Sequence, residues 1–227
     1  MPSFHDFRFL STDGKHNVFA RECTPDGEVR AVLQIAHGVA EHIYRYAPFM
    51  EFLAENGFVV VANDHLGHGK TAENEQELCF FAEKDGWNDV VSDMDTLHKL
   101  TAAKYPDVPY FLFGHSMGSF LTRTYIIDHP EGLKGVVISG TGQNPGAVIA
   151  AGKLMAKLEM IDNGPMYHSP TLDKLAFGSY NKKYVKRPSY SGIVSYFLNS
   201  GHLFHSHYSP PLSDVSSVAS VGSCSSE

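Results

Sequence analysis

The sequence predicts an α/β fold in which a mostly parallel sheet carries helices on both faces. Short apolar runs recur between turn residues, and they are continuous, as is typical of strands buried on both sides. Amphipathic helical patterns lie between these runs, and this alternation of strand and helix favours parallel pairing through crossover connections. The four predicted strands are Val32–Ala36, Phe58–Ala62, Tyr110–Phe113 and Gly135–Ser139.

The first expected helix carries an apolar stripe with the spacing i, i+3, i+4, i+7, and two further apolar stripes follow it. The three stripes begin near Tyr46, near Trp87 and after Ser116. Ahead of all these elements, Asp6–Ser11 and Val18–Cys23 flank a turn that contains a glycine. This arrangement predicts a β-hairpin that precedes the repeated strand–helix units.

The pattern changes after residue 144. Ala147–Ile161 and Leu172–Tyr184 are helical in spacing, with no clear strand between them. We therefore predict a core over residues 1–144 and a partial helical cap over residues 145–187, above the carboxyl ends of the strands. The apolar residues expected to line the cap, by ordinary packing or as the wall of an acyl-chain site, are Ile149, Leu154, Met155 and Leu158.

Composition excludes several classes of protein. The chain is 43% hydrophobic and 19% charged, which is typical of a globular protein. A net charge of −7 argues against nucleic-acid binding. No apolar run is long enough for a transmembrane helix, and the N-terminus does not resemble a secretory signal. Cys23, Cys79 and Cys224 are far apart, so we predict reduced thiols in a cytoplasmic protein.

The last 40 residues differ from the rest. All 18 Lys and Arg residues precede position 188, whereas 13 serines lie in residues 188–227 against 8 in residues 1–187. Such a segment has little apolar surface to bury. We interpret residues 188–227 as either a disordered tail or a translated frameshift.

The strongest chemical signal is Gly114-His115-Ser116-Met117-Gly118, which follows a strand and opens a helix. This context predicts a nucleophile elbow, in which the chain reverses so sharply that only glycine fits two positions before and after the serine. The strained turn would lift the Ser116 hydroxyl clear of the sheet. The alternative is a glycine-rich turn with an incidental serine.

A second signal, His37-Gly38-Val39, directly follows the first parallel strand. Acyl transfer needs two N–H donors aimed at the developing oxyanion, and Gly38 would let the backbone turn toward a ligand. We assign the two donors to the backbone of Val39 and Met117. The alternative is an ordinary strand-to-helix turn.

A third segment, Asn63–Thr71, follows the next strand and contains two histidines, an aspartate and two glycines. The spacing of His65 and His68 does not suit a metal site on a helix. We therefore predict a tight structural loop that braces the floor of the site, and no metal.

The segments HGVAEHIYRY, NDHLGHGKT and GHSMGS, in this order, closely resemble one branch of the α/β-hydrolases. That branch contains monoacylglycerol lipases, lysophospholipases and serine aminopeptidase-like hydrolases, and the resemblance covers about residues 5–187. It implies Ser116 as nucleophile, an oxyanion hole at Val39 and Met117, and a cap that accepts an acyl chain. It implies a small ester or lipid substrate and no cofactor, with His115 as part of the elbow.

The resemblance does not identify the triad acid and histidine. In this fold the chain order is Ser, then Asp or Glu, then His, on loops after two further strands, and we expect these last strands to be missing here. The candidates in that order are Asp128, Asp162, Asp173, His202, His205 and His207. Asp173 with His202 satisfies the order and nothing else, so both roles stay unassigned.

Two functions are therefore possible. The first is a serine hydrolase of carboxylic esters, of monoacylglycerol or lysophospholipid type. The second is a non-catalytic truncated fragment or pseudoenzyme that lacks the acid and the histidine. Without later strands, we also expect Gly135–Ser139 to form an uncovered apolar edge of the sheet.

Overall fold

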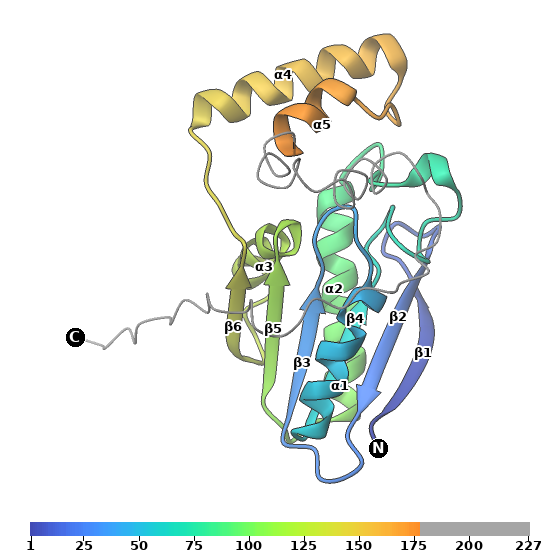
Figure 1. Cartoon of the computed structure of the whole chain (residues 1–227), viewed down its shortest axis with the longest axis vertical. Helices are drawn as coiled ribbons and strands as arrows, with labels where there is room; N and C mark the ends of the chain where they lie inside the picture. The colour runs from blue at the N-terminus through green and yellow to red at the C-terminus, as the bar shows by residue number, and fades with distance from the viewer. Residues whose placement is uncertain (178–227) are drawn as a thin grey trace, which may run out of the picture.

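A mixed sheet of six strands organises residues 1–177, the part of the chain that the computed structural model describes (Figure 1). The strand order is β1-β2-β4-β3-β5-β6. β2 pairs antiparallel with both β1 and β4. β3 pairs parallel with β4 and β5, and β5 pairs parallel with β6. The strands are β1 (Ser3–Leu10), β2 (Asn17–Thr24), β3 (Ala31–Ala36), β4 (Phe58–Asn63), β5 (Tyr110–His115) and β6 (Leu133–Ser139).

The central strands are buried on both faces, as their continuous apolar runs predict. All six residues of β3 are buried. In β4, Val60 and Ala62 pack in one hydrophobic cluster, whereas Val59 and Val61 pack in another. Since neighbouring residues of a strand point to opposite faces, both faces of β4 are covered. The four strands and the hairpin predicted from sequence are confirmed.

Helices cover the two faces of the sheet. α1 (Ala47–Glu55) packs on one face through Met50 and Ala54. α2 (Gly86–Lys104) and α3 (Met117–Asp128) pack on the other face, behind the sheet in Figure 1. Two short 3-10 turns, η1 (Ile43–Tyr46) and η2 (Glu75–Glu77), lie in loops and have no counterpart in the sequence prediction.

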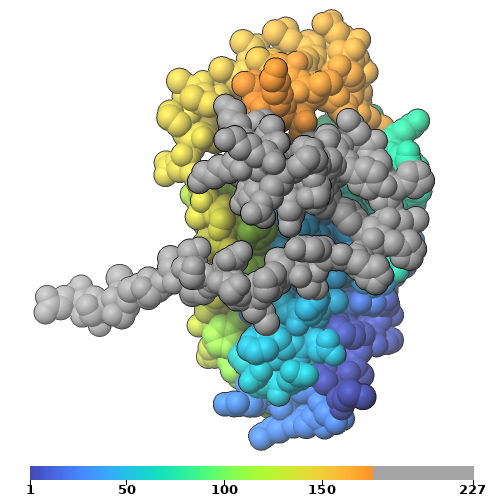
Figure 2. Space-filling model, in the orientation of Figure 1, coloured from blue at the N-terminus to red at the C-terminus, as the bar shows by residue number. Residues whose placement is uncertain are grey.

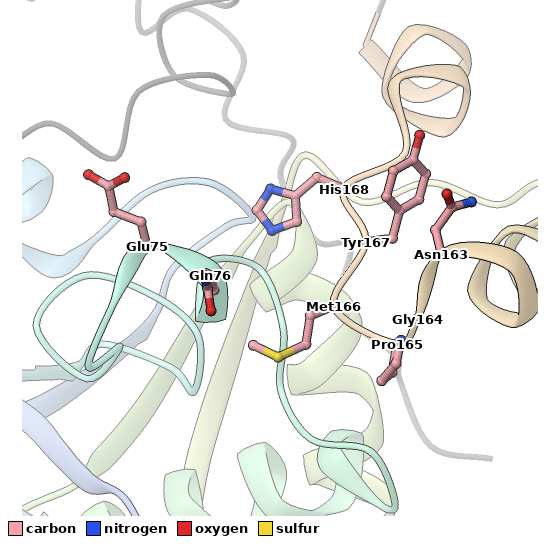
Figure 3. A pocket seen from close by; sticks show the side chains of 8 residues that line it. All are labelled: Glu75, Gln76, Asn163, Gly164, Pro165, Met166, Tyr167 and His168. Atoms are coloured by element: carbon pink, nitrogen blue, oxygen red, sulfur yellow. The ribbon is translucent and has the colours of Figure 1, made fainter.

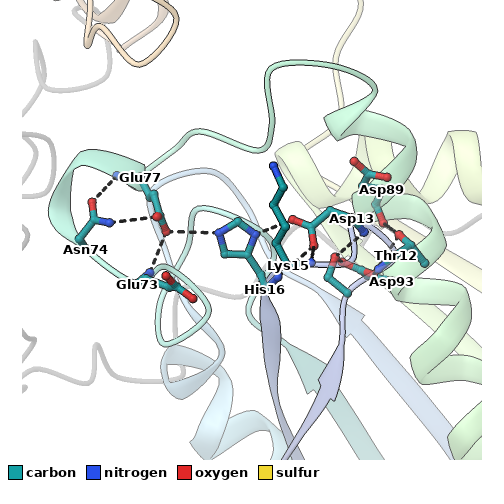
Figure 4. A network of polar contacts seen from close by, with 10 residues as sticks. Thr12, Asp13, Lys15, His16, Glu73, Asn74, Glu77, Asp89 and Asp93 are labelled. Carbon is teal, nitrogen blue, oxygen red and sulfur yellow. Dashed lines mark hydrogen bonds and ion pairs between the residues drawn. The ribbon is translucent and has the colours of Figure 1, made fainter.

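A polar network docks the turn of the β1–β2 hairpin on the rest of the core (Figure 4). Asp93 of α2 accepts hydrogen bonds from the Ser11 hydroxyl at 2.7 Å and the Thr12 N–H at 2.8 Å. His16 lies between two carboxylates, 2.5 Å from Asp13 and 3.6 Å from Glu77. The hairpin turn is thereby tied to α2 and to η2.

β6 forms the outer edge of the sheet. Within residues 1–177, no strand pairs with its outer side, and Val137 and Ile138 are 48% and 37% exposed. The predicted apolar edge is therefore confirmed over this range. Exposed apolar edges of this kind favour association with other chains.

Beyond β6, the chain forms α4 (Gly146–Asn163) and α5 (Pro170–Phe177). Figures 1 and 2 show both helices at one end of the molecule, past the carboxyl ends of β5 and β6. No residue of α4 is buried. The second predicted helix is described as far as Phe177, and the rest of that prediction, the 188–227 tail and Cys224 lie outside the described residues. No helix among residues 1–177 has the length and hydrophobicity needed to cross a membrane.

Candidate active site

Ser116 occupies a strained turn between β5 and α3. Its backbone angles are φ 52° and ψ −116°, in a region that residues other than glycine rarely adopt. Such a conformation costs about 1–3 kcal/mol and persists where its surroundings impose it. Here the Ser116 N–H donates to the Ser139 carbonyl at 2.9 Å, and the Ser119 hydroxyl donates to the Ser116 carbonyl at 2.5 Å. The structure therefore contains the strained turn that the sequence predicts.

The two elbow glycines are required by crowding. A methyl group on Gly118 would overlap the carbonyl oxygen of Ala36, at the end of β3. A methyl group on Gly114 would overlap the Thr122 hydroxyl and the Gly118 carbonyl. The start of α3 thus packs directly against the ends of β3 and β5, which is the crowding expected from the sequence.

The turn after β3 lies beside Ser116. A methyl group on Gly38 would come within 3.1 Å of Ser116 Cβ and 2.7 Å of Glu41 Oε1. Gly38 therefore faces both side chains and leaves no room for one of its own. The fold brings the second sequence signal into contact with the first.

The two amide groups assigned to the oxyanion hole have no acceptor within residues 1–177. Met117 is the first residue of α3, and N–H groups in the first turn of a helix have no intrahelical partner. The positive end of the helix dipole adds to the attraction for an anion at this place. Unpaired donors beside a serine are what an oxyanion hole requires.

His37 fixes the peptide group that carries the Val39 N–H. The backbone N–H of His65 donates to His37 Nε2 at 3.0 Å, so the proton of the neutral ring lies on Nδ1. Nδ1 then donates to the Gly38 carbonyl at 2.8 Å. The Gly38 carbonyl and the Val39 N–H belong to one planar peptide group, so holding the first sets the direction of the second.

Burial and neighbouring histidines keep His37 neutral. Burial lowers its pKa well below the ordinary range, and His65 and His68 lower it further. The His37 ring centroid lies 4.2 Å from that of His65 and 5.3 Å from that of His68. Among the described residues, no group of three His, Cys, Asp or Glu side chains is placed to hold a metal ion.

Asp64 organises the loop that supplies these rings. Its carboxylate accepts the Ile43 N–H at 2.8 Å and the Lys70 N–H at 2.7 Å. Burial raises the pKa of Asp64 to about 6, and the two backbone donors partly oppose that rise. The loop after β4 is thus tied to the turn after β3, which supports its interpretation as a structural brace.

Within residues 1–177, no side chain is hydrogen-bonded to Ser116 Oγ as a general base would be. No hydrogen bond joins Ser116 Oγ to another described residue, and His115 is turned toward β6, with Nδ1 3.3 Å from Ser139 Oγ. Asp128 ends α3, whereas Asp162 and Asp173 belong to α4 and α5. His202, His205 and His207 lie outside the described residues. The structure brings Ser116 next to Gly38 and to the start of α3 at Met117, and it assigns neither acid nor histidine.

A separate cavity of about 510 Å³ lies between η2 and the segment that joins α4 to α5 (Figure 3). Gln76 lines it from one side, and Met166 and His168 line it from the other. No residue of the elbow or of the turn after β3 contributes to its wall. This cavity is therefore distinct from the surroundings of Ser116.

The sheet and the elbow define the chain as an α/β-hydrolase. The family described as Serine aminopeptidase, S33, matches residues 27–178, and the chain belongs to this family. A carboxyl esterase from Bacillus coagulans, solved in complex with glycerol, superposes with a TM-score of 0.74 and is 30% identical. The match covers 90% of this chain and 67% of the esterase. A structure described as a lipase in an open form gives a TM-score of 0.72 at 27% identity, over 88% of this chain and 66% of the lipase.

Curated relatives match over a shorter range. A monoglyceride lipase from Mus musculus is 33% identical over 129 residues, which are 57% of this chain and 40% of the relative. A monoacylglycerol lipase from Mycolicibacterium smegmatis is 32% identical over 140 residues, which are 60% of this chain and 48% of the relative. The chain spans less than half the length of these two relatives.

Proposed function

We propose that the chain is a serine hydrolase of carboxylic esters. The observation that carries the proposal is Ser116 at φ 52°, with Gly38 packed against its side chain and the Val39 and Met117 amides unpaired within residues 1–177. A strained serine beside two free N–H donors suits attack on an ester carbonyl. The elbow and turn glycines Gly38, Gly114 and Gly118 make room for this arrangement.

In the proposed mechanism, Ser116 Oγ forms a bond to the ester carbonyl carbon as its proton passes to a base. The carbonyl oxygen becomes an oxyanion, which accepts hydrogen bonds from Val39 and Met117. The carbon–oxygen bond to the leaving alcohol then breaks, and that alcohol takes the proton. Water hydrolyses the acyl-enzyme by the same steps and regenerates Ser116. The base and its acid partner would come from sequence other than residues 1–177.

We propose a substrate with an apolar acyl chain, of monoacylglycerol or lysophospholipid type. The names of the mouse and mycobacterial relatives support the first of these. Residues 145–187 would form the cap, in which α4 presents exposed apolar side chains such as Ile149, Leu154 and Leu158. The free thiols of Cys23 and Cys79 support a cytoplasmic location.

A fluorophosphonate probe tests the nucleophile. We expect the probe to label the 227-residue chain and Ser116→Ala to abolish that labelling, together with hydrolysis of a monoacylglycerol. Ser92→Ala, on the remote helix α2, is the matched control and should be labelled as strongly as the wild type. Equal labelling of wild type and Ser116→Ala would reject the proposal.

The second candidate function is a non-catalytic fragment or pseudoenzyme. The absence of a base around Ser116 within the described range favours it. It predicts that wild type is labelled no more than Ser116→Ala and that no ester is turned over. The same experiment therefore separates the two candidates.

A further inference from the structure

We infer that Glu41 is a positioning residue of the oxyanion hole, which acts by holding Gly38; the inference rests on the proposed function. The Glu41 side chain reaches back along its own turn, and Oε1 accepts the Gly38 N–H. The same oxygen accepts the Tyr46 hydroxyl proton at 2.8 Å. The carboxyl group is therefore fixed from two sides before it meets any substrate.

Glu41 lies close to the reacting serine. The position that a Gly38 methyl group would occupy is 2.7 Å from Glu41 Oε1 and 3.1 Å from Ser116 Cβ. The carboxylate and the Ser116 side chain therefore both border the position of Gly38. The Glu41 side chain is only 11% exposed, so water competes little for its hydrogen bonds.

Glu41 and His37 together fix both polar groups of Gly38. Glu41 holds its N–H, and His37 Nδ1 holds its carbonyl at 2.8 Å. Glycine has more backbone freedom than any other residue, so an unheld Gly38 would let the following N–H swing. With both groups held, the Val39 N–H keeps one direction before the oxyanion forms. Donors aligned in advance stabilise a transition state without reorganisation.

The Glu41 carboxylate also faces a cation, since its Oε2 lies 3.7 Å from Arg45 Nε. A carboxylate beside a developing oxyanion repels it, so a charged group at this place opposes the reaction by itself. In this inference Glu41 acts through its hydrogen bond to Gly38, while Arg45 and Tyr46 hold the carboxylate in place. Glutamine keeps a carbonyl oxygen for the same donors and carries no charge. Glu41→Gln should therefore retain the function that Glu41→Ala loses.

The experiment compares Glu41→Gln and Glu41→Ala in the 227-residue chain, with a short-chain nitrophenyl ester as substrate. We expect Glu41→Ala to lower kcat by about 10- to 100-fold while KM changes by less than about 3-fold, because the loss falls on the transition state. Glu41→Gln should stay within about 3-fold of wild type. Glu55→Ala, at the end of α1, is the matched control. An unchanged kcat in Glu41→Ala, or equal losses in both variants, would overturn the inference.

Amide hydrogen exchange at Gly38 gives a readout that does not need turnover. We expect the Gly38 amide to exchange at least about 10-fold faster in Glu41→Ala and at nearly the wild-type rate in Glu41→Gln. Amides of β3 should be unchanged in both, which shows that the fold persists. An inactive wild type would defeat the proposed hydrolase and leave this comparison intact. Equal exchange at Gly38 in wild type and Glu41→Ala would defeat the role of Glu41.

Discussion

The sheet core and the α4–α5 region are built in opposite ways. Around the elbow, Leu121 of α3 is fully buried and every residue of β3 is buried. In α4 no residue is buried, and Leu154 is 60% exposed. The same kinds of apolar side chain therefore face other side chains in one region and largely solvent in the other.

We expect this contrast to separate residues that stabilise the fold from residues of the proposed cap that would contact a ligand. The Met117 amide begins α3 and the Val39 amide follows the buried strand β3 by three residues, so we expect the packing of the core to keep both in place. Elements with few buried contacts open at lower free energy than the core. We therefore expect substitutions in the core to decide whether the chain folds, and substitutions in α4 to change little except contacts with a ligand.

The largest effect is expected for an added methyl group in the core. In Gly118→Ala the new carbon would overlap the Ala36 carbonyl oxygen, a backbone atom at the end of the buried strand β3 that has little room to move. We expect a loss of at least about 3 kcal/mol in the free energy of unfolding, or no folded protein. Urea unfolding followed by circular dichroism measures it.

The matched substitution in α4 is Gly152→Ala. No heavy atom lies within 4 Å of the position that its methyl group would occupy. Since alanine favours a helix over glycine by about 1 kcal/mol, α4 should gain stability, seen as slower amide exchange in that helix. Equal destabilisation by the two substitutions would show that α4 packs as tightly as the core.

A truncation of leucine gives the next largest contrast. Leu121→Ala should lower the free energy of unfolding by about 2–5 kcal/mol, because it leaves a cavity between α3 and the sheet. Leu154→Ala should change it by less than about 0.5 kcal/mol, because the side chain is largely solvated. Urea unfolding of the two variants measures both changes in the free energy of unfolding. A loss above 2 kcal/mol in Leu154→Ala would contradict the contrast.

Much of the core could be predicted because continuous apolar runs in the sequence indicate strands that are buried on both faces. The runs Val32–Ala36 and Phe58–Ala62 are buried on both faces, and they form β3 and β4 almost residue for residue. β5 extends two residues past its predicted end at Phe113, because backbone pairing with β6 continues after the apolar run stops. Strand order was not predictable, since β4 lies between β2 and β3 and an apolar run does not specify its neighbours.

The parts of the candidate site that could be predicted are those where a crowded turn of the backbone accepts only certain residue types. Ser116 and its flanking glycines follow from a crowded strand-to-helix turn, and the roles of Val39 and Met117 stay predictions. Glu41 was not among the predicted site residues, because a hydrophobic pattern does not indicate which local hydrogen bonds a polar side chain makes. A signal was present, since a glutamate three residues after Gly38 resembles the side chain of a capping box that reaches back to an N–H.

The smallest expected effect is a change in the pH dependence of the free energy of unfolding, through the buried histidines of the core. His65 is 1% exposed, and neither ring nitrogen has a hydrogen-bond partner. Burial, followed by the neighbouring His68, lowers its pKa to about 3. An unfolded chain therefore binds the proton near pH 6.5, and the folded chain binds it only near pH 3. The stability due to neutral His65 is present above pH 6.5 and is lost as the pH falls toward 3.

His65→Leu should weaken this pH dependence. Between pH 7 and pH 5 the wild type should lose about 2 kcal/mol through His65, and the variant should be spared that loss. At pH 7 the variant should be nearly as stable as the wild type, because it removes two unpaired polar atoms. Urea unfolding at pH 7, 6 and 5 measures the difference. His168→Gln, at an exposed position before α5, is the control and should follow the wild type. Parallel pH curves for wild type and His65→Leu would show that the core histidines do not set the acid limit of the fold.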